Sequence, residues 1–97
     1  MNRANLSGTI LEITQPMSFQ RDGMKYNYRT VIIDVGETII AANWWSDDEL
    51  PKEGAKVEFT IEVRSERNNK TPELFYHKLN LKSIYEPNTV YSTVQYN

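Results

Sequence analysis

The sequence predicts an all-β protein built as a small barrel of five short strands. Apolar and polar side chains alternate along several segments, which is typical of strands that bury one face and expose the other. Glycine, proline, asparagine and aspartate gather between these segments, whereas helix signals are almost absent. Five short strands in 97 residues must close on themselves or leave unpaired edges, so closure into one barrel domain is expected.

The first strand is expected over residues 6–14, where β-branched and apolar residues predominate. Gly8 lies inside this segment. A glycine within a strand usually marks a bulge or a sharp bend, as barrel closure requires. Gln15-Pro16 ends the strand, and a polar stretch leads from there to a turn at Asp22-Gly23.

The second strand is expected over residues 26–35. Its alternation places Val31 and Ile33 on the buried face, and Tyr26 and Tyr28 on the outer face. The two tyrosines are two residues apart, so the pleat of the strand puts their rings on the same side.

The third strand is expected over residues 38–45 and ends in the pair Trp44-Trp45. Adjacent side chains in a strand point to opposite faces, so one indole should be buried and the other exposed. The periodicity does not decide which of the two is outside. The acidic residues 46–54, with a proline among them, are expected to form a loop.

The last two strands of the barrel are expected over residues 56–67 and 74–84. Ile84 is out of phase with the apolar residues before it, which indicates a bulge or the end of the strand. We expect the domain to comprise residues 1–86 and to be followed by a tail, residues 87–97. The tail alternates weakly, so it is expected either to add a further strand or to be mobile.

The composition excludes several classes of protein. There are no cysteines, which rules out disulfides, thiolate zinc sites and a cysteine nucleophile, and which fits a reducing compartment. No apolar run is long enough to cross a membrane, and the first residues lack the apolar core of a signal peptide. The expected location is therefore the cytoplasm of a bacterial cell or of a virus-infected host.

The charges are unevenly distributed although the net charge is only −2. Residues 37–62 contain seven acids and two lysines, which leaves nine bases against six acids in the remainder of the chain. The basic flanks favour binding of a polyanion, and the alternative that the charges serve only solubility stays open.

Nothing in the sequence requires catalysis. The single histidine, His77, lies inside a strand in phase with core residues, and neither a serine elbow nor a phosphate-cradling glycine loop is present. Asp47 and Asp48 are adjacent, so their carboxylates diverge on an extended backbone. We therefore expect no enzyme, no cofactor and no metal.

Several segments, taken in order, resemble the bacterial single-stranded-DNA-binding proteins and their primosomal relatives. Residues 5–10 (NLSGTI) are similar to the opening strand of that family, and residues 39–45 (IIAANWW) to its third strand. An acidic linker and residues 50–59 (LPKEGAKVEF) then resemble its entry to strand four, and residues 75–84 (FYHKLNLKSI) its last strand. The acidic C-terminal tail of the bacterial members has no counterpart here, which suits a viral or plasmid version.

The resemblance implies an OB-type barrel that binds single-stranded DNA without sequence preference during replication or recombination. Such binding requires aromatic faces for the bases and cations for the phosphates. In OB folds both lie on the second and third strands and on the loops after the first and fourth. The predicted rings are Tyr26, Tyr28, Trp44, Trp45 and Tyr76. The predicted cations are Arg21, Lys25, Arg29, Arg64, Arg67, Lys70, Lys78 and Lys82.

Other interpretations stay open at this point. Phe19 either stacks on a ligand or closes the end of the barrel, and the remaining rings and cations are also compatible with ordinary packing and a solvated surface. A barrel that binds other proteins is a second hypothesis, with homo-oligomers formed through edge strands or through residues 89–96. An RNA-binding barrel is a third, and it ranks below DNA because the aromatic repeats of cold-shock-type barrels are not seen.

Overall fold

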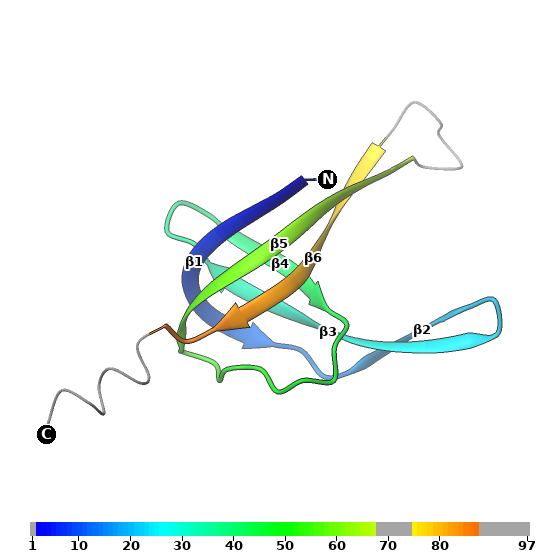
Figure 1. The fold of residues 1–97 in the computed structure, drawn as a ribbon, viewed down its shortest axis with the longest axis horizontal. Helices are drawn as coiled ribbons and strands as arrows, with labels where there is room; N and C mark the ends of the chain where they lie inside the picture. The colour runs from blue at the N-terminus through cyan, green and yellow to red at the C-terminus, as the bar shows by residue number, and fades with distance from the viewer. Residues whose placement is uncertain (1, 68–74, 88–97) are drawn as a thin grey trace, which may run out of the picture.

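The computed structural model describes residues 2–67 and 75–87, with the side chains of 65–67 and 75–77 left out of the description. Within these ranges there is no helix, which confirms the all-β prediction. Figure 1 shows the six strands, which are β1 (Asn2–Ile13), β2 (Met17–Arg21), β3 (Met24–Asp34), β4 (Ile39–Trp44), β5 (Lys56–Arg67) and β6 (Phe75–Tyr85).

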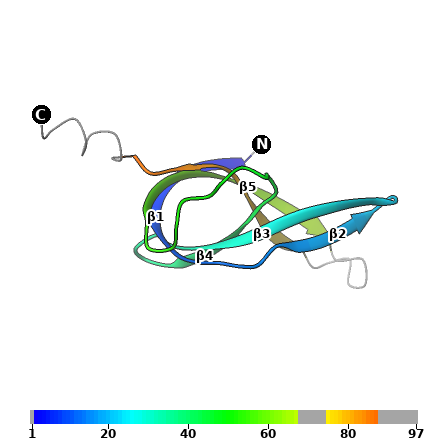
Figure 2. The ribbon, with the colours of Figure 1, turned by 90° about the horizontal axis from the view of Figure 1, so that it is seen from below.

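The strands form one sheet that closes on itself. Its order is β1-β5-β6-β4-β3-β2, and β1 also pairs with β3, so five strands form a ring of pairings from which β2 is excluded. The β4–β6 pair is parallel and every other pair is antiparallel. Figure 2 shows the sheet curving round on itself, with the β2–β3 hairpin extending away from it.

Closure of the sheet depends on the bend in β1. Residues 2–9 of this strand pair with β5, and Thr9 also begins the pairing with β3, so Gly8 lies where the strand passes from one partner to the other. A Cβ atom at Gly8 would collide with the carbonyl oxygen of Asp34 and would approach Ile33 Cγ2 to 2.9 Å. A register shift follows at once between Ile10 and Glu12. The predicted association of this glycine with a bend and a bulge is therefore confirmed.

Replacing Gly8 with alanine is expected to destabilise the fold by about 1–3 kcal/mol, because backbone must move to accept the methyl group. Urea unfolding followed by circular dichroism measures the effect. Ser7→Ala is the matched control, since Ser7 is exposed on the same strand and its loss should change stability by less than about 0.5 kcal/mol. Equal midpoints for the two variants would show that the close approach of β1 to β3 does not restrict residue 8.

The core lies inside the ring of strands. The predicted faces of β3 are confirmed, because Val31 and Ile33 are fully buried. Residues from all five strands of the ring contribute to the core, which consists of Ile10, Val31, Ile33, Ala42, Trp44, Val57, Phe59, Ile61 and Leu81.

Strand β2 is additional to the five predicted strands, because its residues were expected to be part of a loop. Residues 17–21 instead pair with β3 across a two-residue turn, with Phe19 opposite Tyr26. Asp22 and Gly23 have φ values of 53° and 76°, and two positive φ angles fit the type I′ turn that matches the twist of a hairpin. All five residues of β2 are exposed, so the hairpin adds surface and no core.

The predicted irregularity near Ile84 is a bulge in β6. Thr60 pairs with Ser83 and Ile61 with Leu81, so Lys82 is an extra residue without a directly opposed partner on β5. The shift brings Ile84 opposite Phe59, where it packs against the core. The predicted tail, residues 87–97, lies outside the described residues except for Pro87.

The acidic residues between β4 and β5 form the loop that was predicted. The Trp44 indole donates a hydrogen bond from Nε1 to the carbonyl oxygen of Asp48 at 3.1 Å, and the Asp48 amide donates to Ser46 Oγ at 2.9 Å. Gly54 N donates to the carbonyl oxygen of Ile10 at 2.7 Å. These bonds hold the loop against β4 and β1. The described part of the chain has no helix that is long and apolar enough to span a membrane.

Candidate nucleic-acid interface

The side of the sheet that faces away from the core, called here the outer face, is continuous across four strands. Opposed residues of an antiparallel pair point to the same side. The β2–β3 register therefore groups Phe19 with Tyr26, and the β3–β4 register groups Thr30 with Asn43. Asn43 in turn pairs with Asn80 on β6. Thr30, Asn43 and Asn80 each adjoin a buried residue and so point away from the core, and the pairings extend their side of the sheet from β2 across β3 and β4 to β6.

The two tryptophans lie on opposite sides of this sheet. Trp44 is 8% exposed and belongs to the core, whereas Trp45 is 42% exposed and lies on the outer face. The prediction that one indole is inside and the other outside is confirmed. Trp44, one of the predicted binding residues, is therefore placed in the core and not on the outer face.

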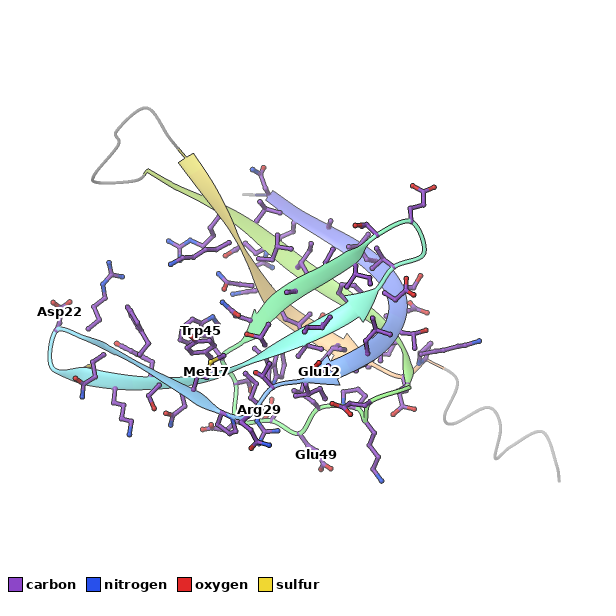
Figure 3. All side chains as sticks on the ribbon, turned by 180° about the vertical axis from the view of Figure 1, so that it is seen from behind. Glu12, Met17, Asp22, Arg29, Trp45 and Glu49 are labelled. Atoms are coloured by element: carbon purple, nitrogen blue, oxygen red, sulfur yellow. The ribbon has the colours of Figure 1, made fainter. Side chains whose placement is uncertain are left out.

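Trp45 is held by residues from three strands. The ring of Tyr28 lies against it, with centroids 4.6 Å apart and planes tilted by 35°, and Phe19 contacts it edge-on at 6.4 Å and 77°. The Trp45 indole donates from Nε1 to Asn80 Oδ1 at 3.1 Å. We call Phe19, Tyr28 and Trp45 the aromatic platform. Figure 3 shows Trp45 at the base of the β2–β3 hairpin, with Met17 labelled beside it.

The hairpin continues the apolar surface beyond the platform. Tyr26 is 43% exposed on the same face of β3 as Tyr28, and its hydroxyl donates a weak hydrogen bond to Met24 Sδ at 3.8 Å. Met17 and Met24 are also exposed. Large apolar groups therefore follow one another along the hairpin toward its tip, in a form that flat bases can contact.

Cations flank this apolar track on the outer face. Arg21 is in phase with Phe19 on β2, and on β6 Lys78 lies two residues before Asn80 and opposite Arg64 of β5. Lys82 is exposed at the bulge of β6. Each of these side chains is exposed, so phosphates that pass beside the rings meet positive charge.

An acidic group beside this part of the outer face is itself paired. Glu62 lies opposite Asn80 in the β5–β6 register, and its Oε2 atom is 3.6 Å from Arg3 Nε. The guanidinium offsets the carboxylate charge, although an exposed pair of this kind contributes little to stability.

Two predicted cations lie elsewhere. Lys25 and Arg29 alternate with Tyr26 and Tyr28, so they point to the opposite side of β3. Arg29 lines a cleft of about 650 Å³ together with Lys52 and the carboxylates of the loop between β4 and β5. Of the platform rings, only Tyr28 reaches this cleft. Lys25 and Arg29 therefore do not belong to the outer-face set, and the acids that share the cleft with Arg29 repel phosphate there.

The structure does not describe the side chains of three further predicted residues, Arg67, Lys70 and Tyr76. The side chain of His77 is likewise outside the description. The structure in turn identifies Asn80, which the sequence patterns did not indicate, and places Phe19, for which two expectations were open. Asn80 anchors Trp45, and Phe19 packs against it rather than closing the barrel end. The signal for Phe19 was present as the alternation of Met17, Phe19 and Arg21 before a two-residue turn. Asn80 had no comparable signal, because its role depends on the pairing of β4 with β6.

The sequence matches no protein-family model and no curated protein. The function is therefore inferred from the outer face itself.

Among the residues that the structure describes, no group of three or more His, Asp or Glu side chains is arranged to hold a metal ion. The hydrogen bond that Tyr85 Oη donates to Glu58 Oε1 at 3.0 Å raises the pKa of Tyr85, and the negative charge of Glu58 adds to this effect. Glu58 and Tyr85 lie opposite one another on β5 and β6, apart from the aromatic platform.

Proposed function

We propose that this chain is an OB-type barrel that binds single-stranded DNA without strong sequence preference, and that it protects exposed strands during replication or recombination. The observation that carries the proposal is the grouping of exposed rings and cations on one face of the sheet. Tyr26 and Trp45 are each more than 40% exposed there, and Arg21 and Lys78 lie on the same face.

The strand order supports the OB-type assignment. Following the ring of pairings gives β1–β3–β4–β6–β5 and a return to β1, which is compatible with a five-stranded barrel of Greek-key type. In that assignment β3 and β4 are the second and third barrel strands, and the β2–β3 hairpin belongs to the connection after the first. The aromatic platform thus occupies the surface that OB folds use for oligonucleotides.

The mechanism that follows is stacking combined with neutralisation of phosphates. A flexible strand lies across the outer face, its bases stack on the open faces of Trp45 and Tyr26, and its phosphates approach Arg21 and Lys78. Each stacked base contributes about 1–3 kcal/mol, and every base has a face that can stack, which accounts for weak sequence preference. The contacts of Trp45 with Phe19, Tyr28 and Asn80 fix the indole beforehand, so little ordering is left for the binding step.

Fluorescence anisotropy of a labelled dT oligonucleotide, measured across a salt series, tests this proposal. We expect tight binding at low salt, and we expect Arg21→Ala to flatten the log–log salt dependence by about 0.7 for each phosphate that is no longer neutralised. Lys52→Ala is the matched control, because Lys52 lines the acidic cleft and should leave the slope unchanged. Absence of binding at low salt would refute the proposal, and tighter binding of an rU oligonucleotide would reassign the surface to RNA.

A protein-binding barrel is the second candidate, and the free edge of β2 favours it. This strand ends the sheet order and carries exposed Met17 and Phe19, and such edges can accept a strand from another chain. Sedimentation velocity distinguishes the two. A defined oligomer that Ser18→Pro disperses, in a chain that does not shift the anisotropy of any oligonucleotide, would favour this candidate.

A further inference from the structure

The free edge of β2 exposes the backbone of two residues. The two-residue turn makes its flanking residues, Arg21 and Met24, a hydrogen-bonded pair, and bonded and non-bonded pairs alternate from there along an antiparallel ladder. Ser18 and Gln20 are therefore in non-bonded pairs with β3, and their N–H and C=O groups point away from that strand. No other strand within residues 2–67 and 75–87 pairs with β2, so these groups form an open edge.

Nothing in β2 blocks this edge. Edge strands are usually protected from pairing by proline, lysine or a bulge. The sequence of β2, MSFQR, contains neither proline nor lysine, and its register with β3 is unbroken. On the outer face Met17 and Phe19 are 39% and 45% exposed, so apolar surface lies beside the open backbone. Both features favour pairing with a strand from another chain.

We propose that two copies of this chain pair through β2, antiparallel and with Phe19 on the two-fold axis, and that single-stranded DNA holds the pair together. In this register Ser18 of one copy lies opposite Gln20 of the other, so the outward N–H and C=O groups bond one another. A register centred on Ser18 would place Gln20 opposite Pro16, which has no N–H. A register centred on Gln20 would place Ser18 opposite Asp22, whose φ of 53° is outside the strand range.

The side chains of β2 are self-complementary in this register. Met17 lies opposite Arg21 of the second copy, so the one charge of the strand meets no like charge. The two Phe19 rings lie directly opposite one another across the axis, where aromatic pairs stabilise a sheet. The axis is perpendicular to the sheet, because the paired strands are antiparallel neighbours within it, so both outer faces lie on the same side. The two aromatic platforms thus become one surface.

The pair is weak without DNA. Stable protein interfaces bury about 1,200–2,000 Å², which is more than an edge of five residues can supply. A single strand bound to both platforms brings the second copy to a millimolar local concentration, so an edge contact with a dissociation constant of about 0.1 mM tightens its binding about tenfold. The strand crosses the two platforms in opposite directions, which suits stacking that does not read sequence. This coupling rests on the proposed function.

Sedimentation velocity and anisotropy titration with dT oligonucleotides of about 8 and about 35 nucleotides test the pairing, because one OB fold covers about 4–16 nucleotides. We expect one copy on the short oligonucleotide and pairwise cooperative binding on the long one. Ser18→Pro removes an outward N–H at a position where edge strands accept proline, so it should keep the affinity for the short oligonucleotide and lose the cooperativity. Ser18→Ala is the matched control, since it loses the same hydroxyl and its bond to Asn27 Oδ1 but keeps the N–H, and it should bind as the wild-type chain does.

Cysteine cross-linking tests the register independently of the proline variant. The chain has no cysteine, so Phe19→Cys supplies one thiol per copy, and with the long oligonucleotide it should oxidise to a covalent dimer because directly opposed residues are within disulfide reach. Gln20→Cys is the control, since the two Gln20 residues are diagonal neighbours about 7–8 Å apart, beyond that reach. Independent binding of wild-type copies to the long oligonucleotide, equal cooperativity in Ser18→Pro, or equal cross-linking of the two cysteine variants would overturn the inference while the proposed function stands. If the wild-type chain binds neither oligonucleotide at low salt, both fail.

Discussion

Replacing Tyr26 and Trp45 together with alanine is expected to reduce affinity for single-stranded DNA by about 2–6 kcal/mol, which is the contribution of two stacked bases. Both rings are more than 40% exposed and neither belongs to the core, so the double variant should stay folded, with a somewhat lower urea midpoint because Trp45 loses its contacts with Phe19, Tyr28 and Asn80. Anisotropy titration with a labelled dT oligonucleotide at constant salt measures the loss.

Tyr85→Ala is the control for this pair. Tyr85 is 54% exposed on the same strand as Asn80, but it lies opposite Glu58, whose charge repels phosphate. Its removal should leave DNA affinity unchanged. Loss of affinity in Tyr85→Ala comparable with that in the double variant would mean that exposed rings bind the ligand without regard to their place on the sheet.

Replacing Phe59 with alanine is expected to destabilise the fold by about 3–5 kcal/mol, the range typical of a large ring removed from a packed core. Phe59 is 2% exposed, and its strand lies between β1 and β6. Since domains of this size have a total stability of roughly 5–15 kcal/mol, the variant should unfold at a much lower urea concentration. Urea unfolding monitored by circular dichroism gives the difference.

Ile39→Ala provides the comparison for Phe59→Ala, because Ile39 is a strand residue that is 58% exposed and its truncation leaves no internal cavity. A change of less than about 0.5 kcal/mol is expected there. Similar midpoints for Phe59→Ala and Ile39→Ala would contradict the position of the core inside the ring of strands.

Much of the fold could be predicted from local patterns. Alternation located β3 and β5 and their buried faces, and the phase break at Ile84 predicted the bulge of β6. Strand β2 was missed because the alternation of Met17 and Phe19 with polar residues covers only five positions, all of them exposed, and the strand forms through its pairing with β3 across the turn at Asp22-Gly23. A short polar segment becomes a strand when a hairpin turn places a partner beside it.

The site was harder to predict, since it depends on which strands are neighbours. Alternation was sufficient to place Tyr26 and Tyr28 on one side, and the same rule applied to Lys25 and Arg29 would have placed them on the other. It could not choose between Trp44 and Trp45, which was decided by the packing of Trp44 against the core and its hydrogen bond to Asp48. Asn80 enters the site through the β4–β6 pairing, a contact between residues far apart in the sequence.

Tryptophan fluorescence during titration with a dT oligonucleotide tests the central claim most directly, because the two indoles lie on opposite sides of the same sheet. Excitation at the red edge, where tyrosine does not absorb, reports on Trp44 and Trp45 alone. We expect saturable quenching in the wild-type chain and in Trp44→Phe, and loss of that quenching in Trp45→Phe. Unchanged emission in the wild-type chain at saturating DNA, or quenching that persists in Trp45→Phe and disappears in Trp44→Phe, would contradict binding on the outer face.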